Sequence, residues 1–251
     1  MKYLDIQAIY VMWLRQMKRF VRSKSRLITS LAQPLLFLFI LGSGFNQLRM
    51  PGISGSYIHF FAPGIIAMSI LFSSMFTGVS VLWDKQFGFL QELLVAPVSR
   101  ISITIGRTLG GATTALIQGF IILLIAIAIG IPISSVFGFL LAIIFMILIA
   151  FSAVGFGLIF ASKMQDFQGF PLVMNLIIMP LLFLSSAFFP VSSNQALQTI
   201  AYFNPLYYMV DGLRGSLIGT SANLPLDFLV TIIFGVTMLS LGSYFFSKME
   251  V

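Results

Sequence analysis

Ionisable side chains are scarce in this sequence, and their positions limit the chemistry that it can perform. The chain has 251 residues, of which 8% are charged, with one histidine and no cysteine. A carboxylate inside an apolar segment would indicate a proton or ion pathway, and clustered histidines would indicate a metal site. The acids and bases near the apolar segments fall at their ends instead: Asp84, Arg107, Lys163, Asp166 and Asp227. If the chain moves a substrate against a gradient, the driving force must come from elsewhere; the alternative is that it is not a pump.

Sequence motifs of common enzymes are also missing. The chain contains no HExxH zinc motif, no GxSxG nucleophile elbow and no GxxxxGK[ST] phosphate-binding loop. The single histidine, His59, lies near the start of an apolar segment, where an ordinary interfacial residue is expected. The sequence therefore predicts a chain that is not an enzyme and does not bind ATP through a phosphate loop.

Composition places the chain in a membrane. Apolar residues make up 59% of it, and its 8% of charged residues compares with roughly a quarter in a soluble domain. With so few charges, most of the chain cannot face water. At roughly 20 apolar residues per crossing, the length suits a single helical bundle. We therefore expect an all-α membrane protein with one transmembrane domain, residues 1–251.

Six apolar segments separated by polar turns predict six transmembrane helices. We place them at 27–45, 58–82, 101–129, 136–161, 170–189 and 228–246. Small residues at near four-residue spacing in the third segment predict close approach of a neighbouring helix. These residues are Gly106, Gly110, Gly111, Ala115 and Gly119.

Residues 1–24 predict an amphipathic helix at the membrane surface. Apolar residues recur at helical spacing along one stripe: Ile6, Ile9, Tyr10, Trp13, Met17, Phe20 and Val21. The other face carries Arg15, Lys18, Arg19 and Arg22, and like charges four residues apart on a helix repel each other. An anionic lipid surface would relieve that repulsion, so we expect this helix to lie in the plane of the headgroups. Packing against another protein is the alternative.

Lysine and arginine are unevenly distributed between the two sides of the predicted bundle. Of the 14 basic residues, only Arg49 and Arg214 fall on the side opposite the termini, which leaves twelve on the side of the termini. Because loops rich in lysine and arginine stay in the cytoplasm, we expect a multi-pass protein of the cell membrane with both termini cytoplasmic. The positive charge therefore belongs to the lipid bilayer rather than to nucleic acid.

Two segments between the crossings are too apolar for plain loops. Residues 84–100 are predicted to be cytoplasmic, yet they keep Phe87, Phe89, Leu90, Leu93, Leu94 and Val95. A partner protein would cover such a face; burial under the chain's own bundle is the alternative. Residues 190–225 are predicted to form short external re-entrant helices. Asn204 and Pro205 would start one of them, and Asp211 could pair with Arg214 three residues later.

Phenylalanine and methionine are frequent in the second and fifth crossings. Their side chains can repack around varied ligands, which would suit an adaptable apolar cavity. Packing against lipid or within the bundle is the alternative for each of them.

The two unusual segments give the chain a family resemblance. It resembles the type-2 ATP-binding-cassette (ABC) export permeases, closest to their daunorubicin-resistance-like and multidrug branch. The first segment is similar at Asp84, 87–90, Glu92, 94–97, 99–100 and 106–107, and the second at 184–190 and 204–214. Gln86 and Gln91 depart from that pattern, because relatives often carry an acid and a base there. The resemblance runs in order along essentially the whole chain.

This resemblance implies a permease driven by a separate ABC ATPase, which would bind ATP and Mg²⁺, so that no cofactor is expected in this chain. The ATPase would couple through Asp84, Phe87, Gly88, Glu92, Leu93, Leu94, Pro97 and Arg100. Two copies of the permease would pair as a homodimer and enclose a path at Phe72, Met75, Phe76, Met174, Asn175 and Phe183. The outer gate would be Phe188, Phe189, Pro190, Asn204, Pro205, Asp211 and Arg214.

The resemblance leaves the cargo open. Scarce charge in the crossings favours an apolar or amphipathic cargo, such as a drug, lipid or glycolipid, moved by alternating access. A polysaccharide or ion exporter of the same family is an alternative. A membrane enzyme acting on lipids and a scaffold protein that transports nothing are alternatives from other classes.

Overall fold

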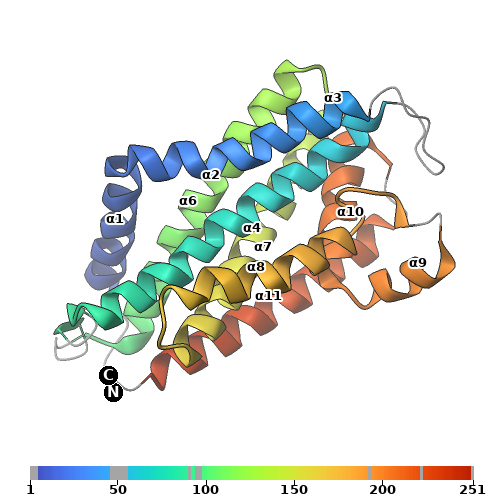
Figure 1. Ribbon diagram of the computed structural model, residues 1–251. Coiled ribbons are helices and arrows are strands. Elements are labelled where there is room, and N and C mark those ends of the chain that lie inside the picture. Colours follow the sequence, from blue (N-terminus) through green and yellow to red (C-terminus); the bar gives the residue numbers. More distant parts are fainter. Residues whose placement is uncertain are drawn as a thin grey trace.

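The computed structural model describes residues 5–45, 56–89, 92–93, 98–191, 194–220 and 223–249, apart from the side chain of Arg26. Throughout this part of the chain the regular elements are helices (Figure 1). Their bounds are α1 Ile6–Arg22, α2 Lys24–Leu36, the π-helix η1 Phe37–Leu41, α3 Gly42–Gly44, α4 Tyr57–Gln86, α6 Arg100–Ala128, α7 Val136–Lys163, α8 Gly169–Phe183, α9 Gln195–Tyr202, α10 Pro205–Ile218 and α11 Leu224–Ser247. The expected all-α class is confirmed.

Five helical segments in the described residues are long and apolar enough to cross a membrane. They are Leu27–Gly44, which joins α2, η1 and α3, and the helices α4, α6, α7 and α11. The expected crossing at 170–189 corresponds to α8, which has 15 residues and ends at Phe183. At 1.5 Å per residue it is about 22 Å long, shorter than the roughly 30 Å of a hydrocarbon core. The predicted count of six crossings is therefore not confirmed.

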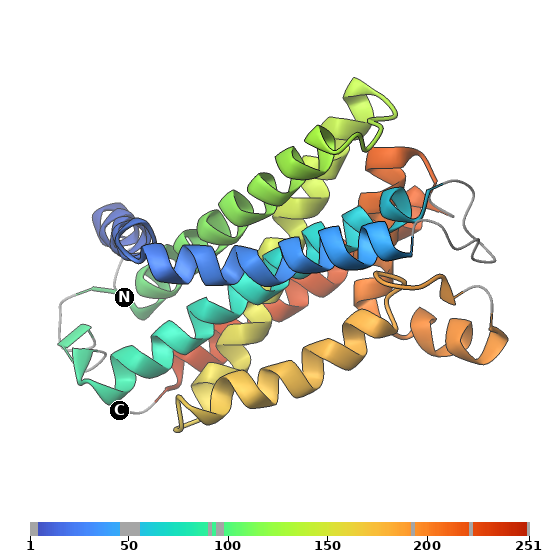
Figure 2. The same ribbon diagram turned by 45° about the horizontal axis from the view of Figure 1, so that its top comes forward.

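Helix α4 forms the centre of the bundle. It packs against α2, α6, α7, α8 and α10, and 83% of its most apolar window is buried, against 17% for the first span and for α11. The long helices run side by side, and α1 stands across the end of α2 (Figures 1 and 2). The start of α1 and the end of α11 lie at one end of the bundle, with α9 and α10 at the other. Helix α4 therefore runs from one end of the bundle, beside α10, to the other, beside α1.

Polar caps fix where the helices at these two ends begin. Asp5 accepts hydrogen bonds from the amides of Gln7 and Ala8 at the start of α1, at 2.9 and 3.2 Å. Ser99 accepts from the amide of Ser102 at the start of α6, at 3.1 Å. Such caps satisfy amides that have no partner within the helix.

The small residues of α6 let two helices approach it closely. A Cβ atom added at Gly106 would lie 2.6 Å from Cβ of Met12 in α1, and one at Gly111 would lie 2.3 Å from Oγ1 of Thr77 in α4. Gly110 likewise faces Gln16 of α1. The predicted close approach at these residues is confirmed, and it holds α1 and α4 against neighbouring faces of the same helix.

We predict that Gly111→Ala lowers the free energy of unfolding by about 1–3 kcal/mol, because overpacking costs this much where the neighbour cannot move. Thr77 is β-branched and has little rotamer freedom in a helix. Gly157→Ala is a matched control, since its added Cβ would have no neighbour closer than 3.7 Å. Unfolding in mixed SDS micelles, followed by circular dichroism, compares the two. Equal stability of both variants would contradict the close packing of α6 on α4.

Candidate functional site

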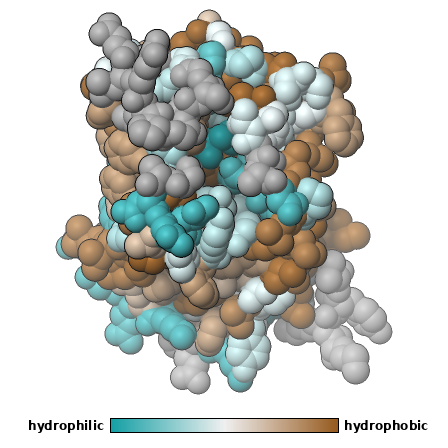
Figure 3. All heavy atoms as spheres, turned by 90° about the vertical axis from the view of Figure 1, so that its right-hand side faces the viewer, coloured by the Kyte–Doolittle hydropathy of each residue, from teal (hydrophilic) through white to brown (hydrophobic). Residues whose placement is uncertain are grey.

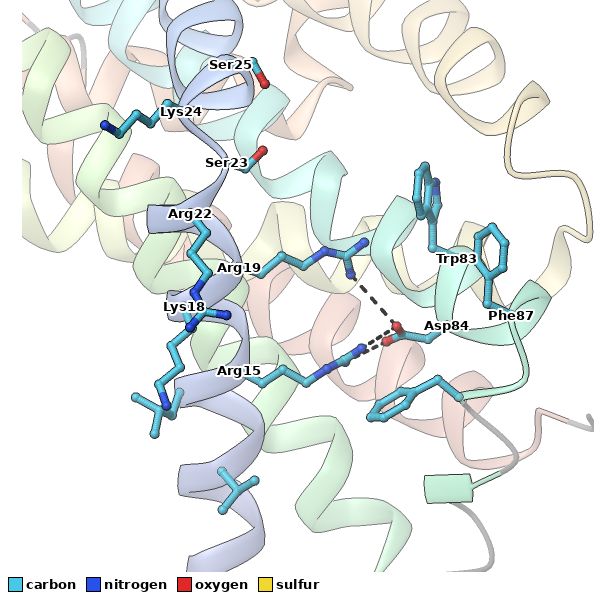
Figure 4. Close-up of a pocket in the computed structure, with 13 residues that line it drawn as sticks. Arg15, Lys18, Arg19, Arg22, Ser23, Lys24, Ser25, Trp83, Asp84 and Phe87 are labelled. Atoms are coloured by element: carbon cyan, nitrogen blue, oxygen red, sulfur yellow. Dashed lines mark hydrogen bonds and ion pairs between the residues drawn. The ribbon is translucent and has the colours of Figure 1, made fainter.

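A carboxylate at the end of the central helix gathers three arginines. Asp84, in the last turn of α4, is 4% exposed. Arg15 of α1 donates two hydrogen bonds to it, at 2.6 and 2.9 Å, and Arg107 of α6 donates one at 2.6 Å. Arg19 lies 3.9 Å from the same carboxylate. Figure 4 shows Arg15 and Arg19 reaching from α1 across to Asp84. One acid therefore joins α1, α4 and α6.

Arg107 makes this cluster part of the core. Its side chain is fully buried, and its guanidinium carbon lies 5.6 Å from the centre of the Phe246 ring at the end of α11. Among the described residues, its Nε and Nη1 atoms have no hydrogen-bond partner. A buried cation is stable only with a counter-charge, so the position of Arg107 depends on Asp84.

The basic face of α1 is divided between this cluster and the surface. Arg15 and Arg19 turn toward Asp84, while Lys18 and Arg22 are exposed. On the apolar side Ile6, Tyr10 and Val21 are exposed, although Phe20 is buried. Helix α1 also packs on α6, so an interfacial position stays a prediction, while contact with its own bundle is observed.

The coupling residues predicted from the sequence occupy different environments. Asp84 is buried and faces α1 and α6, whereas Phe87 is 70% exposed and Glu92 is exposed. Gly88 has a φ of +76°, a left-handed conformation that favours glycine. Leu93 packs partly against the core, and Arg100 donates a 2.7 Å hydrogen bond to the carbonyl of Ser247. Leu94 and Pro97 lie outside the described residues.

Asp84, Phe87 and Phe89 of this segment line one side of a large cavity. The cavity has a volume of about 1060 Å³ and lies between α1, the α1–α2 junction and the end of α4. Its lining is Val11, Leu14, Arg15, Lys18, Arg19, Arg22, Ser23, Lys24, Ser25, Trp83, Asp84, Phe87 and Phe89 (Figure 4). Arg15 also stacks on the Phe89 ring, at 3.9 Å from its centre. The hollow is therefore strongly basic with one aromatic wall.

The residues predicted to line a substrate path separate into two groups. Met75 and Met174 are buried inside the bundle, and Phe72 is partly buried. Phe76, Asn175 and Phe183 are exposed on its outer surface. The structure therefore does not bring all six into one cavity within a single chain, and Met174 acts as a core residue of the bundle.

The opposite end of α4 carries a second polar cluster. Arg214 of α10 donates hydrogen bonds to the carbonyls of Phe60 and Ser186, at 3.2 and 2.5 Å, and its guanidinium stacks on the Phe60 ring. Its predicted pairing with Asp211 is confirmed at 3.5 Å. Burial lowers the pKa of Arg214 to about 10, so the side chain stays charged at neutral pH. Figure 3 looks onto this end and shows hydrophilic side chains near its middle, with hydrophobic ones along the flanks.

The segment around Ser186 packs directly against α4. Tyr57 donates a 2.8 Å hydrogen bond to the carbonyl of Phe188, which is buried, while Phe189 is 41% exposed and Pro190 is partly buried. A Cβ atom at Gly64 would lie 2.3 Å from the carbonyl oxygen of Ala187. The segment and the first turns of α4 therefore form one packed unit.

Helix α10 begins where the sequence predicts. Asn204 accepts from the amide of Leu206 at 3.0 Å and donates to the carbonyl of Leu181 at 2.6 Å, with Pro205 at the first helical position. This one residue therefore starts α10 and attaches it to α8.

Sequence patterns did not predict the partners of Asp84. Arg15 was expected at the lipid surface, and Arg107 had no expected partner. An acid at the end of an apolar helix needs a nearby cation, and that requirement was the available signal. Which of the fourteen basic residues would supply it depends on how α1 folds back onto α6, and no local pattern encodes this.

Comparison with known proteins identifies a family. The sequence profile of the ABC-2 type transporter family matches residues 7–218. The putative transport permease ycf38 of Cyanophora paradoxa is 30% identical over 216 residues, covering 84% of this chain and 74% of that protein. Nodulation protein J of Rhizobium leguminosarum bv. viciae is 29% identical, covering 77% and 75%. The inner membrane transport permease YadH of Escherichia coli K12 is 25% identical, covering 98% and 94%.

We predict that Asp84→Asn lowers the free energy of unfolding by about 3 kcal/mol, because it leaves the buried charge of Arg107 without its counter-charge. Adding Arg107→Met should recover part of this loss by removing the orphaned charge. Unfolding in mixed SDS micelles measures both effects.

Asp166→Asn serves as the control for this experiment. Asp166 is an exposed acid that caps the start of α8, and asparagine caps equally well. Similar losses at positions 84 and 166, or no recovery in the double variant, would show that the fold does not depend on the Asp84 cluster.

Proposed function

The chain belongs to the ABC-2 type transporter family, and we propose that it works as the transmembrane subunit of an exporter driven by a separate ABC ATPase. The family match over residues 7–218 carries this proposal. The chain is a non-catalytic permease, and its sequence has no phosphate-binding loop. ATP and Mg²⁺ would therefore be bound by the partner subunit, and mechanical work would enter through a protein–protein contact.

The exposed side chains around Gly88 support a docking surface for the ATPase. Phe87 is a large exposed aromatic residue, and Glu92 supplies an exposed charge in the same segment. Aromatic residues are frequent anchors of protein interfaces, and charges help to fix orientation. Asp84 lies one turn before Phe87, so force applied at the surface would reach α1 and α6 through its ion pairs.

The outward face of α8 supports pairing with a second copy. Leu172, Leu176 and Phe183 are exposed on it, and the amide of Asn175 lies among them at the middle of the helix. A polar amide facing hydrocarbon is unfavourable, whereas a second protein surface or a substrate path could satisfy it. The proposed homodimer would place α8 and the exposed Phe76 of α4 beside the cargo.

The proposed cargo is an apolar or amphipathic molecule, such as a drug, lipid or glycolipid. The described spans carry few ionised side chains apart from those near the ends of α4, α6, α7 and α11, which suits such a cargo. The excess of lysine and arginine on the side of the termini supports a cytoplasmic location for both termini. Cargo would then leave through the end that carries α9 and α10.

We predict that Phe87→Asp prevents an ABC ATPase from co-purifying with the tagged chain from membranes of its native host. The introduced carboxylate would have to be buried without a partner, which typically costs several kcal/mol. The readout is mass spectrometry of the captured subunits together with ATP hydrolysis by the complex.

Phe203→Asp is the matched control for the docking experiment. Phe203 is 86% exposed at the opposite end of the bundle, so its replacement should leave the ATPase bound. Loss of the ATPase from both variants would indicate general damage. Retention by Phe87→Asp would place the docking surface elsewhere.

We predict that Asn175→Cys forms a disulfide between two copies under mild oxidation, because α8 would meet its counterpart across the dimer axis. The chain has no cysteine of its own, so a cross-linked dimer on a gel has one source. Val236→Cys, exposed on the outer face of α11, should stay monomeric. Equal cross-linking at both positions would argue against a specific pair through α8.

A further inference from the structure

The cavity beside α1 contains more positive charge than its one acid can balance. Five basic side chains line it, against the single carboxylate of Asp84. That carboxylate already accepts from Arg15 and Arg107. In the part of the chain that the structure describes, Lys18 and Arg22 have no acidic partner, and Arg19 reaches Asp84 only at 3.9 Å. Because Lys18 and Arg22 are four residues apart on one helix, their repulsion favours a bound anion.

The depth of the cavity in the membrane indicates where that anion comes from. Ser23 and Ser25 line the cavity at the junction of α1 and α2. The first membrane-spanning segment begins at Leu27. Two residues of helix correspond to about 3 Å, so the cavity lies beside the edge of the hydrocarbon layer, at the level of the lipid headgroups.

The remaining wall of the cavity is apolar, which distinguishes a lipid from a small water-soluble anion. Val11 and Trp83 are 59% and 37% exposed. An inorganic anion would gain nothing from such side chains. The glycerol and upper acyl chains of a phospholipid would cover them and gain from the burial. The volume of about 1060 Å³ lies near the upper end of small-molecule sites, roughly 300–1,000 Å³.

We propose that this cavity binds the phosphate headgroup of an anionic glycerophospholipid, with Lys18, Arg19 and Arg22 around the phosphate and Trp83 beside the upper acyl chains. Arg15 stays engaged with Asp84 and sets the floor of the site. The proposal requires only that the chain crosses a membrane. It does not rest on coupling to an ATPase or on any choice of cargo, so it can fail while the proposed function stands.

The chain provides its own optical reporter for this site. It has two tryptophans, Trp13 and Trp83. Trp13 lies on the side of α1 that faces α6, where it donates a hydrogen bond to Thr113 at 3.1 Å. In a Trp13→Phe background all tryptophan emission comes from Trp83. Lipids with brominated acyl chains quench a tryptophan only at short range, so quenching reports the lipids next to the cavity.

The experiment uses the full chain, reconstituted in neutral phosphatidylcholine vesicles that contain a small fraction of brominated lipid. We expect brominated phosphatidylglycerol to quench Trp83 as strongly as about fivefold more brominated phosphatidylcholine, the preference that one basic side chain near the surface supplies. Lys18→Gln with Arg22→Gln should abolish this preference. Equal quenching by the two lipids in the parent chain would overturn the proposal.

A second pair of lysines outside the cavity provides a control that distinguishes lipid binding in the cavity from general attraction to the charged surface. Lys163 and Lys248 are exposed, end α7 and follow α11, and lie at the same end of the bundle. Lys163→Gln with Lys248→Gln removes the same charge and should keep the preference. If both double variants lose it equally, the attraction belongs to the whole surface and the site is refuted.

A competition arm distinguishes a lipid from a free anion. Inorganic phosphate and pyrophosphate are added against sodium chloride at equal ionic strength. Preference for phosphatidylglycerol should survive both anions, because neither can occupy the apolar wall. If either anion abolishes it where chloride does not, the cavity takes a soluble phosphate and the lipid assignment is wrong.

Discussion

The arrangement of the bundle at the end of α4 that carries Asp84 depends on how this carboxylate is neutralised. A carboxylate in the last turn of an apolar helix is unfavourable unless cations surround it, and a buried guanidinium is unfavourable without an anion. Asp84 and Arg107 neutralise each other's charge between α4 and α6, and Arg15 brings α1 to the same point. Removing the acid would leave several positive charges crowded together. One carboxylate therefore fixes the positions of α1, α4 and α6 relative to one another.

Close packing fixes the distances between the helices that this electrostatic contact joins. Hydrophobic burial gives little drive for helices to associate inside a membrane, so contact area and small residues matter more. Gly106 and Gly110 let α1 sit on α6, and Gly111 lets α4 approach it from another side. The arginines of α1 can reach Asp84 only because these glycines bring the backbones together. Charge and close packing therefore hold the same three helices together.

Periodicity and composition predicted most of the helices, because the position of a helix depends mainly on residues that are close in the sequence. The apolar segments gave five of the spans, and Asn204 with Pro205 gave the start of α10. The length of α8 was overestimated, since the apolar segment continues through Phe189 while the helix ends at Phe183, before the left-handed backbone of Ser186. Docking and gating residues came from family resemblance, and their roles stay predictions. Arg15 and Arg107 lie 69 and 23 positions from Asp84 in the sequence, so no local sequence pattern identifies them as its partners.

The continuity of α4 has a mechanical consequence. Its 30 residues form one helix of about 45 Å. Asp84 fixes one end to α1 and α6. At the other end Arg214 bridges the carbonyls of Phe60 and Ser186, and Gly64 lies against Ala187. Such a helix behaves as a lever: a tilt of about 10° would carry its tip about 8 Å sideways over this length. Because the segment around Ser186 is packed onto that tip, it would move with α4 as one rigid unit. A movement of the Asp84 end of α4 would thereby move the segment around Ser186 at the other face of the membrane, and no independently moving loop would be needed.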